Sequence, residues 1–341
     1  MTYFPVPLRQ AVRWHPPLLY VAAAMAALAI VSLVGLAVDD RMLGNVSVWL
    51  KPFKFAVSFV AYLVTLAWMV SLMRRSRRIA WWAGTVVAVF GALEVALIVF
   101  QAARGRQSHF NNATPLDETI FGAMGATIGV LYLGSLVLAV LLLRQRMSDP
   151  AVAWTVRLGL IIALVGMALG FLMLRPTPEQ QVGDLDTEGG HSVGVPDGGP
   201  GMFLTGWSTT GGDLRIPHFL GMHALQLLPL LAIALVVLAG RFPRLRDGGV
   251  RLRLVLVAAA TYASLLALVT WQALRGQPLI HPDATTIAVA LGLAGASTVG
   301  VLIALRQPAP SPSNEDERSA PDLSSEDERS EAQVSLAATG A

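Results

Sequence analysis

Eight apolar runs dominate this chain of 341 residues and constrain its fold more than any other feature. Each run has roughly the 20 residues that a helix needs to cross about 30 Å of hydrocarbon. Because a backbone exposed to lipid must satisfy its own hydrogen bonds, the runs are predicted to be helices. The sequence therefore predicts an all-α, polytopic integral membrane helix bundle with spans near 17–38, 55–73, 79–101, 119–143, 154–174, 216–239, 252–273 and 284–305.

Composition supports this class and removes several others. Charged residues make up only 14% of the chain, against about 25% in a typical soluble domain. The chain has no cysteine, which excludes disulfides, thiolate metal sites and cysteine nucleophiles. It also lacks a P-loop, a Gly-x-Ser-x-Gly elbow, a His-Glu-x-x-His motif and a dinucleotide-binding fingerprint, so no known enzyme class is indicated.

The distribution of basic residues predicts the orientation. With the N-terminus placed inside, about two thirds of the 25 Lys and Arg residues fall on the inner segments, as the positive-inside rule expects. Because this topology explains the arginines, no nucleic-acid partner is expected. The Arg- and Ala-rich composition suggests a GC-rich bacterial genome. We therefore expect a multi-pass protein of the bacterial cytoplasmic membrane with both termini in the cytoplasm, and the lipid bilayer as its main partner.

Besides the transmembrane domain 17–306 and its short connections, the sequence predicts three further features. Residues 1–16 form a short cytoplasmic N-terminus. The long outer loop 175–215 is rich in Gly, Pro and acidic residues, which predicts a mobile loop and no folded domain. The tail 307–341 is acidic and rich in Pro and Ser, which predicts a disordered cytoplasmic segment.

Glu94 is the strongest single indication of chemistry, because it lies inside the third apolar run. A charge at the centre of a membrane helix costs at least about 2.5 kcal/mol, so such acids face the interior of the bundle. Gln101 is seven residues further on, nearly two turns, and shares the same face. A functional acid is one interpretation; a Glu that ties two helices together is the other.

The sixth run carries a polar stripe at its outer end. His218, His223 and Gln226 fall within one arc of the helix, and His223 is predicted near the depth of Glu94. Pro229 removes a backbone hydrogen bond, and interrupted helices beside polar residues often line sites in membrane proteins. The structural alternative is that the histidines only join neighbouring helices.

The second run adds a third polar face, which includes Lys54 and Tyr62. Lys54 and its neighbour Lys51 have a structural interpretation, because long basic side chains extend to the membrane interface. They also have a functional one, as cations for Glu94 or for an anionic ligand.

These faces lead to three hypotheses. The first is an outward-facing site among the second, third and sixth spans, centred on Glu94, His223 and Gln226, that binds a small ligand or a cation and is linked to transport. The second is a membrane metal or haem protein, redox or hydrolytic, whose candidate ligands are His109, His218, His223 and Glu94.

The third hypothesis is a structural subunit of a membrane complex, in which Glu94 performs no chemistry. Small residues recur at four-residue spacing in the fifth and eighth runs, and such faces allow close helix contacts. They predict homo- or hetero-oligomers as well as tight packing within the chain. The residues are Gly166, Gly170, Ala288, Gly292, Ala296 and Gly300.

Overall fold

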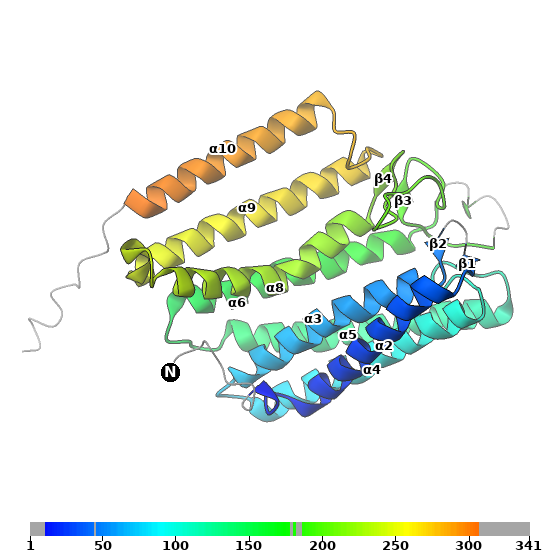
Figure 1. Ribbon diagram of the computed structural model, residues 1–341, viewed down its shortest axis with the longest axis horizontal. Helices are drawn as coiled ribbons and strands as arrows, with labels where there is room; N and C mark the ends of the chain where they lie inside the picture. The colour runs from blue at the N-terminus through cyan, green and yellow to red at the C-terminus, as the bar shows by residue number, and fades with distance from the viewer. Residues whose placement is uncertain (1–10, 44–45, 178–179, 182–185, 307–341) are drawn as a thin grey trace, which may run out of the picture. The chain divides into compact units, whose positions relative to one another are not determined.

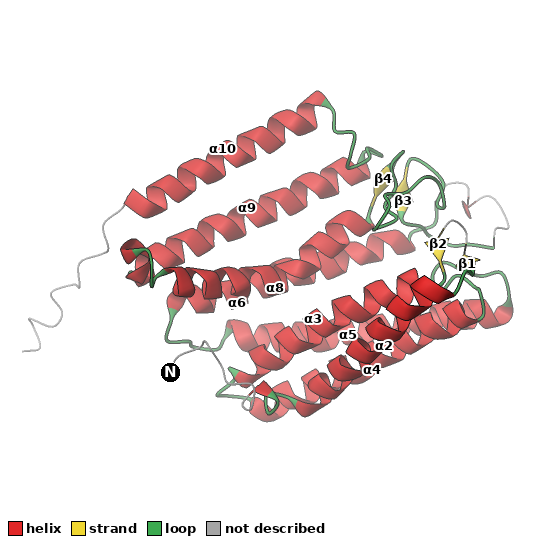
Figure 2. Ribbon diagram, viewed as in Figure 1, coloured by secondary structure: helices red, strands yellow, loops and turns green. Residues whose placement is uncertain are grey.

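The computed structural model describes residues 11–43, 46–177, 180–181 and 186–306. Within these ranges, eight helices are long and apolar enough to cross a membrane, which confirms the predicted fold class. Figure 1 shows them in chain order, and in Figure 2 helix accounts for nearly all regular structure. The predicted cytoplasmic tail 307–341 and most of the predicted N-terminal segment lie outside the described residues. The helices are α2 (Pro16–Val38), α3 (Leu50–Ser71), α4 (Arg77–Ala103), α5 (Pro115–Leu143), α6 (Pro150–Leu169), α8 (Arg215–Leu238), α9 (Gly248–Leu274) and α10 (Ala284–Arg306).

Several helices begin earlier than their apolar runs, because polar caps and prolines form the first turn. Thr114 caps α5 by accepting a hydrogen bond from the backbone N–H of Asp117, and Asp149 caps α6 in the same way. Pro115 and Pro150 then occupy the first helical position, where a missing N–H has no cost. The α3 helix begins at Leu50, five residues before the predicted start.

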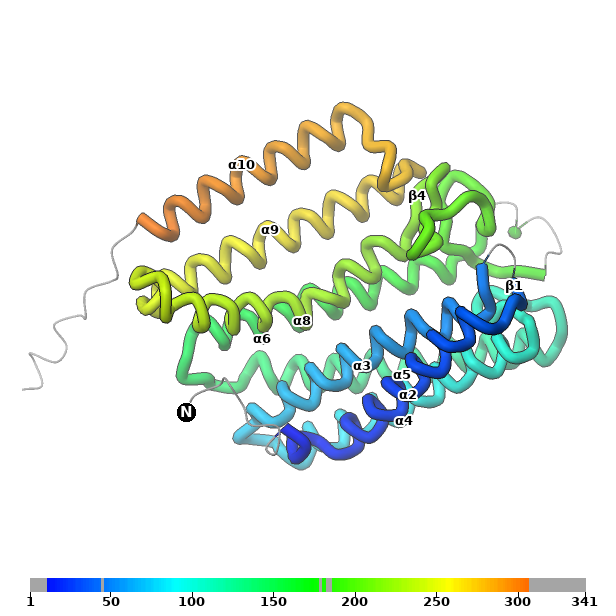
Figure 3. The backbone as a smooth tube through the Cα atoms, in the orientation of Figure 1, coloured from blue at the N-terminus to red at the C-terminus, as the bar shows by residue number. Residues whose placement is uncertain are grey.

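The helices form two neighbouring groups, coloured blue to cyan and green to orange in Figure 3. In the first group α2, α3 and α4 contact one another, and α5 packs on α4. In the second group α6, α8 and α9 pack together, and α10 contacts α9. The groups meet where α5 contacts α6 and α3 contacts α8. The predicted neighbours α3 and α8 therefore do touch.

The two ends of the bundle differ in structure. We call one the loop-rich end; its described residues are 39–43, 46–49, 104–114, 175–177, 180–181, 186–214 and 275–283. Here β1 (Met42–Leu43) pairs with β2 (Val46–Ser47), and β3 (Ser192–Val193) pairs with β4 (Gly212–Asp213). The described part of the long loop 175–215 thus contains short strands but no folded domain. The other end, with residues 11–15, 72–76, 144–149 and 239–247, we call the arginine-rich end.

The tryptophans mark both ends. Each lies in the first or last two turns of a membrane-spanning helix or in an adjoining loop. Tryptophan is enriched at the two interfaces of a bilayer, where its ring is apolar and its N–H can reach water. This distribution agrees with eight helices that contact lipid. The eight residues are Trp14, Trp49, Trp68, Trp81, Trp82, Trp154, Trp207 and Trp271.

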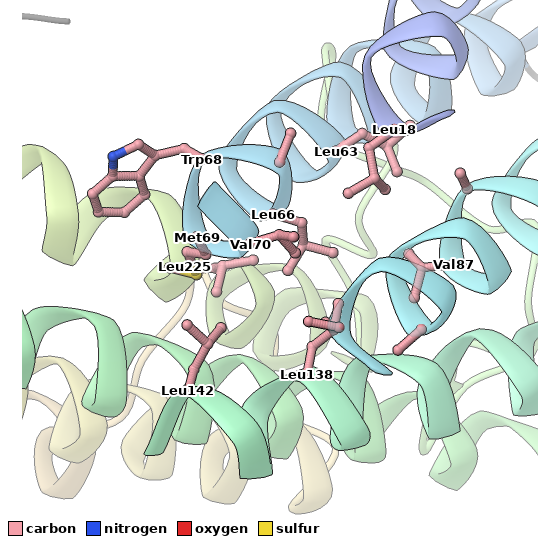
Figure 4. Packing of buried hydrophobic residues seen from close by; sticks show 14 of the residues in the cluster. Leu18, Leu63, Leu66, Trp68, Met69, Val70, Val87, Leu138, Leu142 and Leu225 are labelled. Atoms are coloured by element: carbon pink, nitrogen blue, oxygen red, sulfur yellow. The ribbon is translucent and has the colours of Figure 1, made fainter. Parts of the chain in front are cut away.

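The largest apolar core lies in the half of the bundle next to the arginine-rich end. Leu63 and Leu66 of α3 pack there with Leu138 and Leu142 of α5, all between 0% and 1% exposed. Figure 4 shows these side chains, together with Leu225, filling the space between the helices.

Small residues bring two helices into direct contact, as predicted for Gly166. A Cβ added to Gly166 of α6 would lie 2.5 Å from the backbone of Gly221 in α8. No side chain fits there, so the two backbones touch. Gly292 of α10 is different, because an added Cβ would meet nothing within 4 Å. The predicted oligomer contacts through such faces stay a prediction.

Candidate functional site

Glu94 lies inside the bundle on α4 and is 2% exposed. Its Oε2 atom accepts a hydrogen bond of 2.6 Å from the Thr127 hydroxyl on α5. Its Oε1 atom lies 3.7 Å from Nε2 of His109, which comes from the loop between these two helices. Glu94 is nine residues from the end of α4, about 14 Å below the loop-rich end. The buried acid predicted from the sequence therefore has two polar partners at that depth.

His109 connects Glu94 to α3. Its Nδ1 atom lies 3.1 Å from the Lys51 ammonium and 3.0 Å from the Ser108 hydroxyl. A lysine ammonium can only donate hydrogen bonds, so Nδ1 is the acceptor and the ring proton is assigned to Nε2. The Nε2 atom lies 3.7 Å from Oε1 of Glu94, which is longer than a hydrogen bond. Lys51, His109, Glu94 and Thr127 thus form one chain of polar contacts from the start of α3 into the bundle.

The surroundings of His109 favour its neutral form. Burial lowers the pKa of His109 well below its usual value, and the nearby charges of Lys51 and His191 act in the same direction. Three aromatic rings surround the imidazole, with centroids 6.0–6.5 Å away. At neutral pH the imidazole of His109, between Lys51 and the Glu94 carboxyl group, is therefore neutral. The rings belong to Phe55, Phe110 and Phe121.

A turn of the long loop lies over the first turns of α3 and α8. The Lys54 ammonium donates a 2.9 Å hydrogen bond to the carbonyl of Thr205, and Arg215 donates one of 2.7 Å to the next carbonyl, that of Gly206. Gly206 has φ +66°, a conformation that glycine adopts without strain. Asp213, fully buried, holds Arg215 in an ion pair of 2.6 Å. The loop is therefore bonded to both helix groups.

A second histidine lies in this loop. His191 Nδ1 lies 3.1 Å from the Asp197 carboxylate, and its ring contacts Phe110 at a centroid distance of 4.9 Å. Burial lowers the pKa of His191. His191 thus stands next to the aromatic group around His109, and the sequence did not single it out.

The predicted stripe on α8 is only partly joined to this site. His218 Nδ1 donates to the carbonyl of Gly166 at 2.8 Å, which ties α8 to α6. His223 Nδ1 lies 3.4 Å from the Gln226 amide oxygen on the same helix. Among the described residues, no hydrogen bond or ion pair joins His218, His223 or Gln226 to Glu94. The structure places His109 there instead.

Gln101 and Tyr62 have other partners. Gln101 donates to the fully buried Asp117 at 3.0 Å, and Asp117 also pairs with Arg104 at 2.8 Å. This network joins α4 to α5 at the loop-rich end. The Tyr62 hydroxyl lies 2.5 Å from that of Ser135, so it links α3 to α5 between Glu94 and the apolar core. No hydrogen bond or ion pair joins either residue to Glu94 among the described residues, so their predicted part in a ligand site stays a prediction.

The metal hypothesis has no ligand group to support it. Within the part of the chain that the structure describes, no group of three or more His, Asp or Glu side chains could hold a metal ion. Of the four proposed ligands, only His109 and Glu94 are recorded in contact with each other. A metal or haem site stays a prediction.

Sequence reasoning missed Thr127 and Ser135. Both are polar residues inside the apolar run of α5, and this was the available signal. The sequence gives Lys51 both an interfacial and a functional interpretation, and it offers His109 only as a metal ligand.

The fold and the site define an all-α, multi-pass membrane protein with a polar cluster in one half of its bundle. Comparisons with protein-family models, curated proteins and solved structures find no match.

Proposed function

We propose that this chain is a proton-linked membrane transport protein, in which the Glu94–His109 pair carries the proton and a small ligand binds beside it. The single observation behind the proposal is the chain of contacts from Lys51 through His109 and Glu94 to Thr127. Buried ionisable residues in membrane helices mark proton relays and substrate pathways. In such a transfer Nδ1 of His109 takes a proton from Lys51, 3.1 Å away, while the Nε2 proton passes to Oε1 of Glu94, so the imidazole ends neutral. The Nε2 and Oε1 atoms are 3.7 Å apart.

The position of the pair favours access from the loop-rich end. On that side the Thr205–Gly206 turn accepts hydrogen bonds from Lys54 and Arg215, whereas the apolar core lies between Glu94 and the arginine-rich end. A ligand then reaches the site from the loop-rich side. By the positive-inside rule the arginine-rich end faces the cytoplasm, so the site opens outward in a bacterial cytoplasmic membrane.

The proton-binding part is tested by infrared difference spectra of the purified protein between acidic and alkaline buffers. A buried carboxyl group that takes up a proton gives a carbonyl band in the acidic state. We expect this band in the wild type and in Glu118→Gln, a matched control at an exposed acid of α5. We expect its loss in Glu94→Gln. Identical spectra for wild type and Glu94→Gln would contradict the proposal.

The transport part is tested in proteoliposomes loaded with a pH-sensitive dye. Sodium phosphate, sodium acetate or glycine is added outside at constant external pH. Acidification of the interior that requires the protein and is abolished by Glu94→Gln supports proton-linked uptake. No protein-dependent acidification with any of the three, or equal acidification in the variant, counts against it.

A further inference from the structure

The start of α3 carries two lysines that have no carboxylate partner. Lys51 and Lys54 are half-buried in the first turns of this membrane-spanning helix. Among the described residues, neither ammonium lies within the 4.0 Å of an acidic oxygen that defines an ion pair. The ion pairs there use Asp39, Glu94, Asp117, Asp149, Asp197, Asp213 and Asp283.

Arg215 brings a third positive charge to the same place. Residues three apart lie on one face of a helix, so the two lysines are neighbours. Lys54 and Arg215 donate to consecutive carbonyl groups, those of Thr205 and Gly206. Arg215 is also the arginine whose charge acts on both lysines. Three cationic side chains therefore converge beneath one turn of the loop.

The carboxylates nearby are already engaged. Asp213 forms its ion pair with Arg215 and also accepts the backbone N–H of Ser208 at 2.8 Å. Glu94 is bound to Thr127 and faces the ring of His109, which separates it from Lys51. Among the described residues, the charge of Glu94 acts on Lys51 and that of Asp213 acts on Lys54, but neither acid forms an ion pair with a lysine.

Both lysines also have unused donors. An ammonium has three N–H groups. The recorded bonds use one on Lys51, toward His109, and one on Lys54, toward Thr205. Charge-assisted bonds to carboxylate or phosphate oxygens are the strongest that such donors form. The positive end of the α3 helix dipole lies at the same place.

We propose that the ligand of this protein is a small oxyanion, held between the Lys51 and Lys54 ammonium groups under the Thr205–Gly206 turn. Carboxylate and phosphate groups share the required chemistry. The inference rests on the proposed function for its link to protons, since Lys51 touches both the anion and His109. The oxyanion comes either from a free solute or from the phosphate of a lipid headgroup.

The first experiment measures thermal unfolding of the full chain in detergent. Inorganic phosphate or sodium acetate is added, with chloride keeping the ionic strength constant. A ligand of the native state raises the unfolding midpoint in a saturable way. We expect saturation in the wild type, at least tenfold weaker binding in Lys54→Gln, and near wild-type binding in Lys54→Arg. Arg275→Gln, a cation paired with Asp283 elsewhere at this end, is the matched control and keeps wild-type binding.

Native mass spectrometry separates the two sources. A co-purified anionic phospholipid that is lost in Lys54→Gln identifies a headgroup, whereas phosphate or acetate binding by lipid-free protein identifies a free solute. Either result supports the oxyanion site. No bound lipid and no saturable effect of phosphate or acetate would overturn it, as would equal binding by wild type and Lys54→Gln.

Glu94→Gln distinguishes a failure of this inference from a failure of the proposed function. The variant keeps the lysines, so it binds the oxyanion but loses the carbonyl band of the acidic state. If the wild type shows the band but binds no oxyanion, the result supports the proton site and contradicts the oxyanion site. Oxyanion binding without the band reverses that conclusion.

Discussion

The two halves of the bundle differ in the kind of side chain that fills their interior. Next to the arginine-rich end, Leu63, Leu66 and Leu138 fill the interior with aliphatic side chains. In the loop-rich half, Glu94 and its partners His109 and Thr127 occupy the corresponding place. Apolar packing needs no specific partner, whereas each buried polar group needs a hydrogen bond.

This difference separates stability from function. The apolar half can be held by any well-fitting side chains, so changes of shape there act first on the stability of the fold. The polar half holds groups whose burial has a cost and whose protonation can change. A path for protons or ligand would begin in the polar half and would have to pass the apolar half by a change in helix packing.

The largest expected effect comes from putting a charge into the apolar half. Leu63→Asp removes a fully buried side chain and adds a carboxylate, which costs about 2.5–3.5 kcal/mol on membrane-insertion scales alone. We expect little monodisperse protein in size-exclusion chromatography after detergent extraction. Leu63→Met is the control and should cost less than about 1.5 kcal/mol. Normal yields of Leu63→Asp would show that this half is not a sealed apolar core.

A smaller loss is expected from a partner of Glu94. Thr127→Val keeps the shape of the side chain but leaves Glu94 Oε2 without its donor at 2.6 Å. An unsatisfied buried acceptor costs about 1–3 kcal/mol, measured as the change in unfolding free energy in urea. The carbonyl band of Glu94 should also shift in frequency. Thr119→Val is the control, since this threonine is exposed and bonds only within its helix.

The polar half should also make stability depend on pH. Because the folded-state pKa of His109 is lowered, the unfolded chain binds a proton first as the pH falls below about 6.5. The free energy of unfolding is therefore highest above that pH. It falls on acidification, by up to about 1.4 kcal/mol per pH unit for one histidine. In His109→Gln, the midpoint of unfolding should depend less on pH than it does in the wild type. An unchanged slope in the variant would remove His109 as the titrating group.

The smallest effect is expected at the boundary between the halves. Tyr62→Phe removes the hydroxyl that meets Ser135 at 2.5 Å and leaves the ring in place. Ser135 keeps its bond to the carbonyl of Leu131, so the loss should be about 0.5–1.5 kcal/mol in the same denaturation assay. A loss as large as that of Thr127→Val would move the boundary of the polar half toward the arginine-rich end.

Hydropathy predicted the number and type of helices, because the length of an apolar run reflects the thickness of a bilayer. It placed the start of α3 too late, since Lys51 and Lys54 interrupt the run although they lie within the helix. The burial of Glu94 also followed from its position in an apolar run. Its partner did not, because the sequence of a membrane helix does not say which neighbours its polar face meets. His109 reaches Glu94 from a loop, where periodicity carries no information.

The contact between Gly166 and Gly221 has a mechanical consequence. At the Gly166–Gly221 contact no side chain separates α6 from α8, and the two helices approach there as closely as their backbones allow. Gly221 is six residues from the first residue of α8 and 17 from its last, which gives lever arms of about 9 Å and about 26 Å. If α8 rotates as a rigid rod about Gly221, a displacement of its loop-rich end becomes nearly three times larger at its arginine-rich end. The hydrogen bond from His218 to the carbonyl of Gly166, one turn from Gly221, would have to break or shift in such a rotation.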